Sequence, residues 1–282
     1  MPMTRTFSLT ANANAATGAP SLRIVAFQAA AIVAVLAIPS IAALFTDVRQ
    51  LNDVSVWDKP LKFEASLIVH LVTLGLLASL FTPRGAASRT VQLAYQISAT
   101  AAILEIAYIV LQAARGRASH FNSATGIETL MYALMGFGAL LLVLCSFAIG
   151  YALLRAAKPE TPPGLRLGAA WGLMLGSIAT LITAGAMSSG MIDGPGHWVG
   201  GVHSDAGGLP LAGWSTTGGD LRVPHFFATH IMQALPLLGL LADRFARQRN
   251  RALIVGTGAT AMIAVVVLTF AQAVSGRPLL PL

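Results

Sequence analysis

Uninterrupted runs of apolar residues recur along most of the chain, separated by shorter polar segments. Each run is close to the roughly 20 residues that a helix needs to span the hydrocarbon core of a bilayer. A spanning barrel would instead show short segments of alternating polar and apolar residues. The pattern therefore predicts an all-α integral membrane protein, a bundle of about seven transmembrane helices. The seven runs are Ile24–Phe45, Ala65–Phe81, Thr90–Ala114, Thr129–Leu154, Leu167–Met187, Val223–Ala242 and Ala252–Val274.

The segments outside these runs suggest one domain with a tail and a long loop. Residues 1–22 are rich in Ala, Asn and Thr and have no apolar periodicity, so we expect a disordered N-terminal tail. Residues 23–282 are expected to form a single transmembrane helical domain. Its longest connection, 188–222, is rich in glycine, and connections of this length are often functional.

The composition agrees with a membrane protein and excludes several kinds of site. Hydrophobic residues make up 55% of the chain and charged residues only 10%, against about 25% charged in a soluble domain. The single cysteine, Cys145, leaves no CxxC metal or redox motif. No HExxH, GxSxG, P-loop or GxGxxG motif occurs in a suitable context. Small residues such as Gly136, Gly138 and Gly150 are expected to serve helix packing.

Basic residues are distributed unequally between the two sides of the predicted bundle. With a cytoplasmic N terminus, the inner segments hold 11 basic and 2 acidic residues, whereas the outer half holds 7 basic and 9 acidic residues. The positive-inside rule therefore predicts an N-in/C-out orientation. We expect a multi-pass protein of the bacterial inner (cytoplasmic) membrane. Membrane lipids, and not nucleic acid, are the expected partners of its basic segments.

Three ionisable residues lie within the outer half of the predicted spans. His70, Glu105 and His230 are each on the order of 10–12 Å below the outer surface, at a rise of 1.5 Å per residue. Such residues are costly in a bilayer and mark candidate functional sites. Gln112 and Arg115 continue the helical stripe of Glu105 towards the outer surface.

Two sites are compatible with these positions and with the polar residues of the outer loops. A rim site would bind Zn or Cu through imidazoles, and a deeper site would bind a b-type haem or relay protons. Glu105 would accept a proton, while Arg115 and Arg222 would bind an anion or a haem propionate. The predicted metal ligands are His120, His197, His225 and His230, the predicted cofactor contacts are His70, His230, Gln112 and Gln233, and the predicted catalytic residues are Glu105, Arg115, Arg222 and Asp220.

Purely structural roles are the alternative for each of these residues. A histidine within a span is often a hydrogen-bonded packing residue, and Asp220 with Arg222 would then only hold the long loop to the end of a helix. The two histidines at 225 and 230 are five residues apart, about 140° around an ideal helix, so they do not chelate one ion as an i, i+4 pair does. We expect His225 at the outer rim, facing the loops, and His230 with Gln233 facing a cavity.

Three strings resemble an uncharacterised family of bacterial multi-pass membrane proteins. They are VWDKPLKFEAS (56–66), EIAYIVLQAARGRASHFN (105–122) and GLPLAGWSTTGGDLRVPHFFATHIMQALP (208–236). The resemblance covers most of the chain after the tail and implies the multi-pass fold, but it carries no reaction across. It directs attention to Lys59, Lys62, Glu105, Gln112, Arg115, His120, Asn122, His197, Asp220, Arg222, His225, His230 and Gln233.

Together, these observations predict a polar, histidine-bearing site that opens outward in the outer half of the membrane. The first hypothesis is a membrane redox or hydrolytic enzyme that binds a metal ion or haem and acts on a small or lipidic substrate. A proton-coupled transporter or permease is the second hypothesis. The third is a non-catalytic accessory subunit of a larger membrane complex, and an oligomer is compatible with each.

Overall fold

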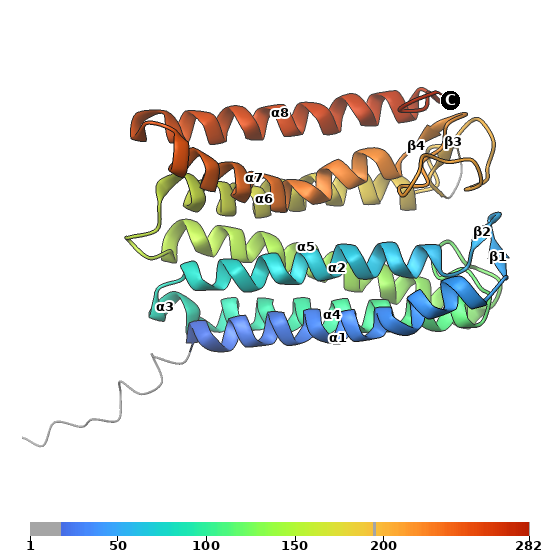
Figure 1. The fold of residues 1–282 in the computed structure, drawn as a ribbon, viewed down its shortest axis with the longest axis horizontal. Coiled ribbons are helices and arrows are strands. Elements are labelled where there is room, and N and C mark those ends of the chain that lie inside the picture. Colours follow the sequence, from blue (N-terminus) through green and yellow to red (C-terminus); the bar gives the residue numbers. More distant parts are fainter. Residues whose placement is uncertain (1–17, 194–195, 282) are drawn as a thin grey trace, which may run out of the picture.

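The computed structural model describes residues 18–193 and 196–281 and is a bundle of long helices (Figure 1). Seven helices are long and apolar enough to span a membrane, which confirms the predicted fold class. The first helix begins at Gly18, inside the predicted tail 1–22, and residues 1–17 lie outside the described residues. The seven are α1 (Gly18–Thr46), α2 (Asp58–Leu77), α4 (Arg89–Ala114), α5 (Gly126–Ala156), α6 (Pro163–Ser188), α7 (Arg222–Phe245) and α8 (Gln248–Val274).

Short elements close the two ends of the bundle. At the end opposite the C terminus lie η2 (Ala78–Leu80) and α3 (Pro83–Ala86). At the other end are two small antiparallel pairs, and the second of them folds the long loop back onto itself. The strands are β1 (Gln50–Leu51), β2 (Val54–Ser55), β3 (Trp198–Val199) and β4 (Gly219–Asp220). We call the end with β1–β4 the outer end, following the predicted orientation.

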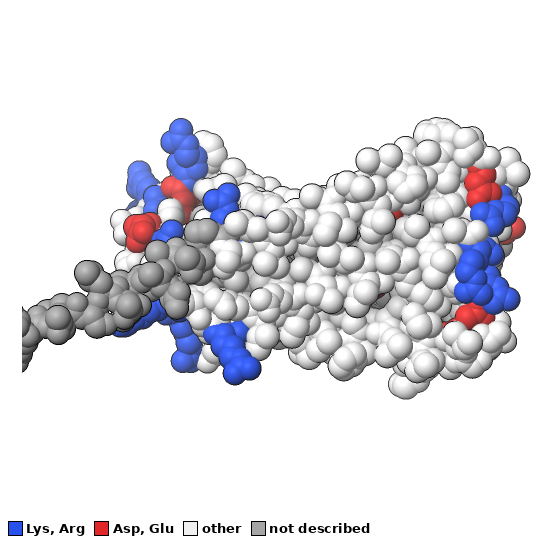
Figure 2. All heavy atoms as spheres, turned by 90° about the horizontal axis from the view of Figure 1, so that it is seen from below, with Lys and Arg blue, Asp and Glu red and all other residues white. Residues whose placement is uncertain are grey.

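Charged side chains gather at the two ends of the molecule, with an almost uncharged band between them (Figure 2). The sides of the helices in this band expose large apolar side chains, including Val35, Leu104 and Ile182, each more than 60% exposed. In water such surfaces would be unfavourable, whereas in a bilayer they are matched by lipid. The surface is therefore that of a multi-pass membrane protein.

Helix α2 begins seven residues before the apolar run that predicted it. The run starts at Ala65, whereas the helix starts at Asp58 with Pro60 in its first turn. Proline is tolerated there because the first N–H groups of a helix have no intrahelical partner. The early start places Lys59 and Lys62 on the helix instead of in a loop.

The closest helix contact joins α6 to α7 along glycines at every fourth position of α6. A Cβ atom on Gly164 would lie 2.5 Å from the Gly239 carbonyl oxygen, and one on Gly172 would lie 2.8 Å from the Pro236 ring. The missing side chains let the two backbones approach closely, as in other small-xxx-small interfaces. The glycines of this stripe are Gly164, Gly168, Gly172 and Gly176.

The glycines named from the sequence have different surroundings. Gly150 packs against α6, where its Cβ would lie 2.8 Å from the Ala170 carbonyl oxygen. Gly136 and Gly138 face open space, so the predicted packing role is wrong for these two. Whether a glycine serves packing depends on the neighbouring helix, which the spacing of small residues within one helix does not reveal.

The helices form two groups that share a core only towards the inner end. The first group is α1, α2, α4 and α5, and the second is α6, α7 and α8, with α5 and α6 in extensive contact where the groups join (Figure 1). Tyr95 and Leu153 of the first group lie in one apolar cluster with Leu173 of the second. The other clusters do not mix: one forms around Ile106 from the first group alone, and another around Ile231 from the second. We call the boundary where α2 faces α7, with sparse contact, the seam.

We expect Gly168→Ala to lower the free energy of unfolding by about 1–3 kcal/mol, because the new methyl group would overlap the Leu235 carbonyl oxygen. The matched control is Gly136→Ala, which adds a methyl group in open space and should leave stability unchanged or slightly higher. Unfolding of the purified protein in mixed micelles measures both. Equal effects of the two substitutions would contradict the glycine contact.

Candidate functional site

Lys59 and Glu105 carry opposite charges at the outer mouth of the seam and are not paired. Lys59 interacts electrostatically with Glu105 of the first group and with Asp205 and Arg222 on the side of the second group. No hydrogen bond and no ion pair within 4.0 Å joins Lys59 or Glu105 to another described residue. The Lys59 ammonium lies 5.8 Å from the centre of the Phe63 ring, in cation–π range. A buried charge without a partner is costly, so this arrangement is typical of a binding site.

Glu105 lies below Lys59 in the bundle. It is only 9% exposed and is about two and a half turns below the outer end of α4. This position agrees with the depth below the outer surface predicted from the sequence, which is on the order of 10–12 Å. Glu105 and Lys59 interact electrostatically but lie farther apart than the 4.0 Å of an ion pair.

His120 lies beside Lys59 in an aromatic environment. Its ring centre is 5.3 Å from that of Phe63 and 6.1 Å from that of Tyr132, and its Nδ1 is 3.0 Å from the Ser119 hydroxyl. Burial, and then the positive charge of Lys59, hold the pKa of His120 well below its usual value. The ring is therefore neutral at pH 7, and it forms one wall of the pocket around Lys59.

Arg222 holds the long outer loop to the start of α7. Its guanidinium donates to two carboxylates of the loop, at 2.7 Å to Asp220 and 2.7 Å to Asp205, and to the Gly213 carbonyl oxygen at 2.7 Å. Asp220 also accepts a hydrogen bond from the backbone N–H of Ser215 at 2.9 Å. The structural role that we considered for Asp220 and Arg222 is therefore present, with Asp205 as an additional partner.

Lys62 holds the same loop to α2. Its ammonium group pairs with Asp58 at 2.6 Å and donates to the Ala212 carbonyl oxygen at 3.1 Å. Because Arg222 binds the neighbouring Gly213, the loop segment 209–214 is fastened on both sides of the seam. This segment therefore connects α2 to α7 at the outer end of the seam.

His197 lies in the outer loop, next to an acid that is already paired. Its Nε2 is buried, lies 3.5 Å from Asp205 Oδ1 and has no hydrogen-bond partner among the described residues. Burial lowers the pKa of His197, and the charge of Arg222 acts in the same direction. Burial of the Asp205 carboxylate raises its pKa, but His197 and Arg222 outweigh this effect and bring it down to about 2.

The histidines of α2 and α7 each have a nearby polar partner. His70 Nε2 is 3.2 Å from the Ser146 hydroxyl of α5, and His230 Nδ1 is 3.3 Å from Gln233 Oε1. His230 interacts electrostatically with His70 across the seam. His70 lies about 18 Å along α2 from Asp58, the first residue of the helix. It is therefore deeper than predicted, because α2 begins earlier than its apolar run.

His225 differs from its predicted position at the rim. Its Nδ1 is 3.1 Å from the Thr183 hydroxyl of α6, so the ring packs between two helices instead of facing the loops. Gln112 was predicted as a cofactor contact and Arg115 as a catalytic residue. In the structure the Arg115 guanidinium donates a hydrogen bond to the Gln112 amide oxygen at 2.7 Å. Gln112 in addition donates to the Ala118 carbonyl oxygen at 3.2 Å, so the pair holds the end of α4.

The predicted metal ligands are not gathered into one site. His120 lies beside α2, His197 in the outer loop and His225 between α6 and α7. Within residues 18–193 and 196–281, no three His, Cys, Asp or Glu side chains are grouped to hold a metal ion. The side of the membrane was predictable from the sequence, but the position of each histidine around the bundle was not.

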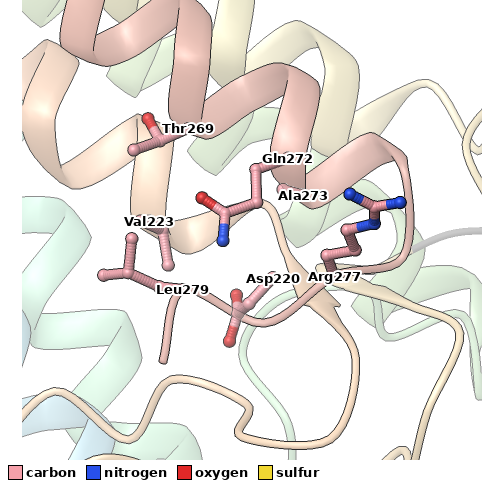
Figure 3. A pocket seen from close by; sticks show the side chains of 7 residues that line it. All are labelled: Asp220, Val223, Thr269, Gln272, Ala273, Arg277 and Leu279. Carbon is pink, nitrogen blue, oxygen red and sulfur yellow. The ribbon is translucent and has the colours of Figure 1, made fainter. Parts of the chain in front are cut away.

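A small pocket behind Asp220 carries no site. It lies between β4, the end of α8 and the C-terminal segment, and it has no space large enough for a water molecule (Figure 3). The Gln272 amide at its edge already donates to the Pro278 carbonyl oxygen at 2.6 Å. The pocket is therefore a packing feature of the outer end.

Comparison with known proteins does not add a function. No family model, curated protein or solved structure matches the chain. The functional argument therefore rests on the arrangement of Lys59, Glu105 and the seam. In the sequence, only the family resemblance points to Lys59. Its spacing to Phe63 and His70 (i, i+4, i+11) nevertheless places the three residues on one helical face.

The outer loop should loosen at acidic pH because of His197. Its pKa is depressed in the folded loop, so its contribution to stability is complete above the unfolded value of about 6.5 and is lost as the pH falls below it. Limited proteolysis of residues 196–221 should accelerate between pH 7.5 and pH 5. His197→Asn should remove this pH dependence, whereas the control His203→Asn should keep it. An unchanged pH dependence in His197→Asn would contradict the assignment.

Proposed function

We propose that the protein is a proton-coupled carrier that binds a small organic anion from the outer side of the membrane. The observation that carries this proposal is the unpaired charges of Lys59 and Glu105 at the mouth of the seam. In the expected N-in/C-out orientation in a bacterial inner membrane, the site opens to the periplasm.

The two charges suggest how an anion and a proton are coupled. The Lys59 ammonium attracts a carboxylate or phosphate group, whereas an ionised Glu105 repels it. Protonation of Glu105 removes this repulsion, so the anion and the proton each favour the binding of the other. This reciprocity is the minimum requirement for transport of an anion together with a proton.

The two-group architecture supports a change of access. The groups share an apolar cluster towards the inner end and have separate clusters elsewhere, so a tilt of one group against the other would open or close the seam. His70 and His230 interact electrostatically with each other across the seam and are, with Glu105, ionisable side chains within the spans. Glu and His side chains within spans are typical of proton relays in membrane proteins.

The enzyme hypothesis differs from this proposal in what the purified protein contains. A haem enzyme has a Soret absorption band, and a Zn or Cu enzyme has near-stoichiometric metal, so an absorption spectrum with elemental analysis separates the enzyme from the other two hypotheses. An accessory subunit differs from a carrier in transporting no anion. Neither alternative draws support from the grouping of the described side chains, so we place the carrier first.

Because the proposed seam is open to the outer side, we expect its lining to be accessible to water from that side only. In a Cys145→Ala background, Ser66→Cys on the seam-facing side of α2 should react with a membrane-impermeant maleimide added from the outer side. Ala99→Cys, in the core of the first group and 7% exposed, should not react. A lack of labelling at position 66 would contradict the outward-open seam.

Proton coupling should depend on Glu105. In proteoliposomes with an imposed pH gradient, the wild type should accumulate at least one anion from a panel of labelled acetate, succinate and phosphate. Glu105→Gln should lose accumulation driven by the gradient but retain exchange, and Lys59→Gln should lose both. Lys158→Gln, at the inner end, is the control for charge. Gradient-driven accumulation by Glu105→Gln would overturn the coupling.

A further inference from the structure

The side of α7 that faces the seam combines polar and apolar residues along one stripe. Phe226, His230, Gln233 and Leu237 recur at i, i+4, i+7 and i+11, so they share one helical face. Phe226 is 45% exposed and Leu237 is 56% exposed, and the two polar residues between them are half-buried. Polar side chains that remain partly exposed at this depth of a bilayer require a matching partner.

The facing side of α2 has the same character. Ser66, Val69, Thr73 and Leu76 form its least buried stripe, with Val69 45% and Leu76 57% exposed. Thr73 bonds only within its own helix, to the Val69 carbonyl oxygen at 2.7 Å. Contact between α2 and α7 is sparse, and His70 of α2 interacts electrostatically with His230 of the α7 stripe across it. Each stripe has a leucine at its inner end, Leu76 on α2 and Leu237 on α7.

Aromatic side chains separate the polar part of the seam from lipid. The Phe226 ring lies 4.3 Å from the His230 ring and 5.3 Å from the Trp214 ring, both edge to face. Trp214 belongs to the loop segment 209–214, which is fastened to α2 and α7. Tryptophan is typical of the membrane interface, where its ring contacts both headgroups and acyl chains.

The tip of this loop segment also presents an apolar side chain. Leu211 is 97% exposed and its φ is +67°, a conformation that costs energy for a leucine. The segment is held by Lys62 and Arg222 on either side, so this conformation is imposed by the surrounding structure. An exposed, strained leucine next to Trp214 is suited to contact with acyl chains.

We propose that the anion taken up at Lys59 is amphiphilic, a carboxylate or phosphate on a single long hydrocarbon chain, and that it enters from the outer leaflet between α2 and α7. The head group lies at Lys59, and the chain follows the two stripes past Trp214 and Phe226 towards Leu237. This inference rests on the proposed anion site and adds the class of substrate. Charge complementarity at Lys59 and the apolar inner ends of the two stripes support a chain rather than a second protein.

Quenching of Trp214 fluorescence by a brominated fatty acid tests this placement directly. 9,10-Dibromostearate is titrated into the intact protein in dodecyl maltoside, and the signal of the Trp214→Phe variant is subtracted to isolate this residue from the other three tryptophans. We expect saturable quenching that unbrominated stearate displaces. In Lys59→Gln the apparent Kd should rise at least about tenfold, whereas Lys158→Gln should match the wild type.

The alternative outcomes separate this inference from the proposed function. If acetate or succinate displaces the probe as well as stearate does, the carrier proposal stands and the amphiphile is overturned. If the probe does not quench Trp214 and no anion of the panel is transported, both proposals are overturned. Disulfide formation between two Ser66→Cys chains in the membrane, without quenching, would assign the stripes to a dimer interface and overturn the amphiphile.

Discussion

The backbone contact between α6 and α7 is the interaction on which the rest of the architecture depends. In lipid, apolar side chains gain little by meeting each other, so close approach of backbones and polar contacts must hold helices together. The glycine stripe of α6 provides this approach. Asp243 of α7 reinforces it, because its carboxylate accepts hydrogen bonds from the backbone N–H groups of Gly164 and Leu165 at 2.9 and 2.6 Å. α8 packs on this pair, and the second helix group behaves as one unit.

The first group is held by apolar clusters and by buried polar contacts between its helices. The hydroxyl of Ser40 donates to Glu64 Oε1 at 2.8 Å between α1 and α2, and both side chains are buried. The two groups meet in a shared cluster only towards the inner end. The outer half of the seam therefore has no common apolar core, and polar residues occupy it at lower cost than elsewhere in the bundle.

Most polar residues near the seam have partners, and this sets the unpaired ones apart. His70 and His225 have hydroxyl partners on a neighbouring helix of their own group, and Arg222 is bound to two carboxylates. Lys59 and Glu105 have neither a hydrogen bond nor an ion pair to a described residue. Arg222, which fastens segment 209–214, also interacts electrostatically with Lys59, so the anion site and the aromatic side chains that flank the seam form one connected region.

The sequence by itself determined the seven helices. A spanning helix satisfies its own backbone hydrogen bonds and has a length set by the bilayer, so apolar runs suffice to locate it. The depth of Glu105 followed from the same helical rise. Only the tertiary structure decided which side chains meet. His120, His197 and His225 share an end of the bundle but occupy separate places, because position around a bundle depends on contacts between helices. Those contacts depend on details such as a glycine opposite a carbonyl oxygen, which no single helix encodes.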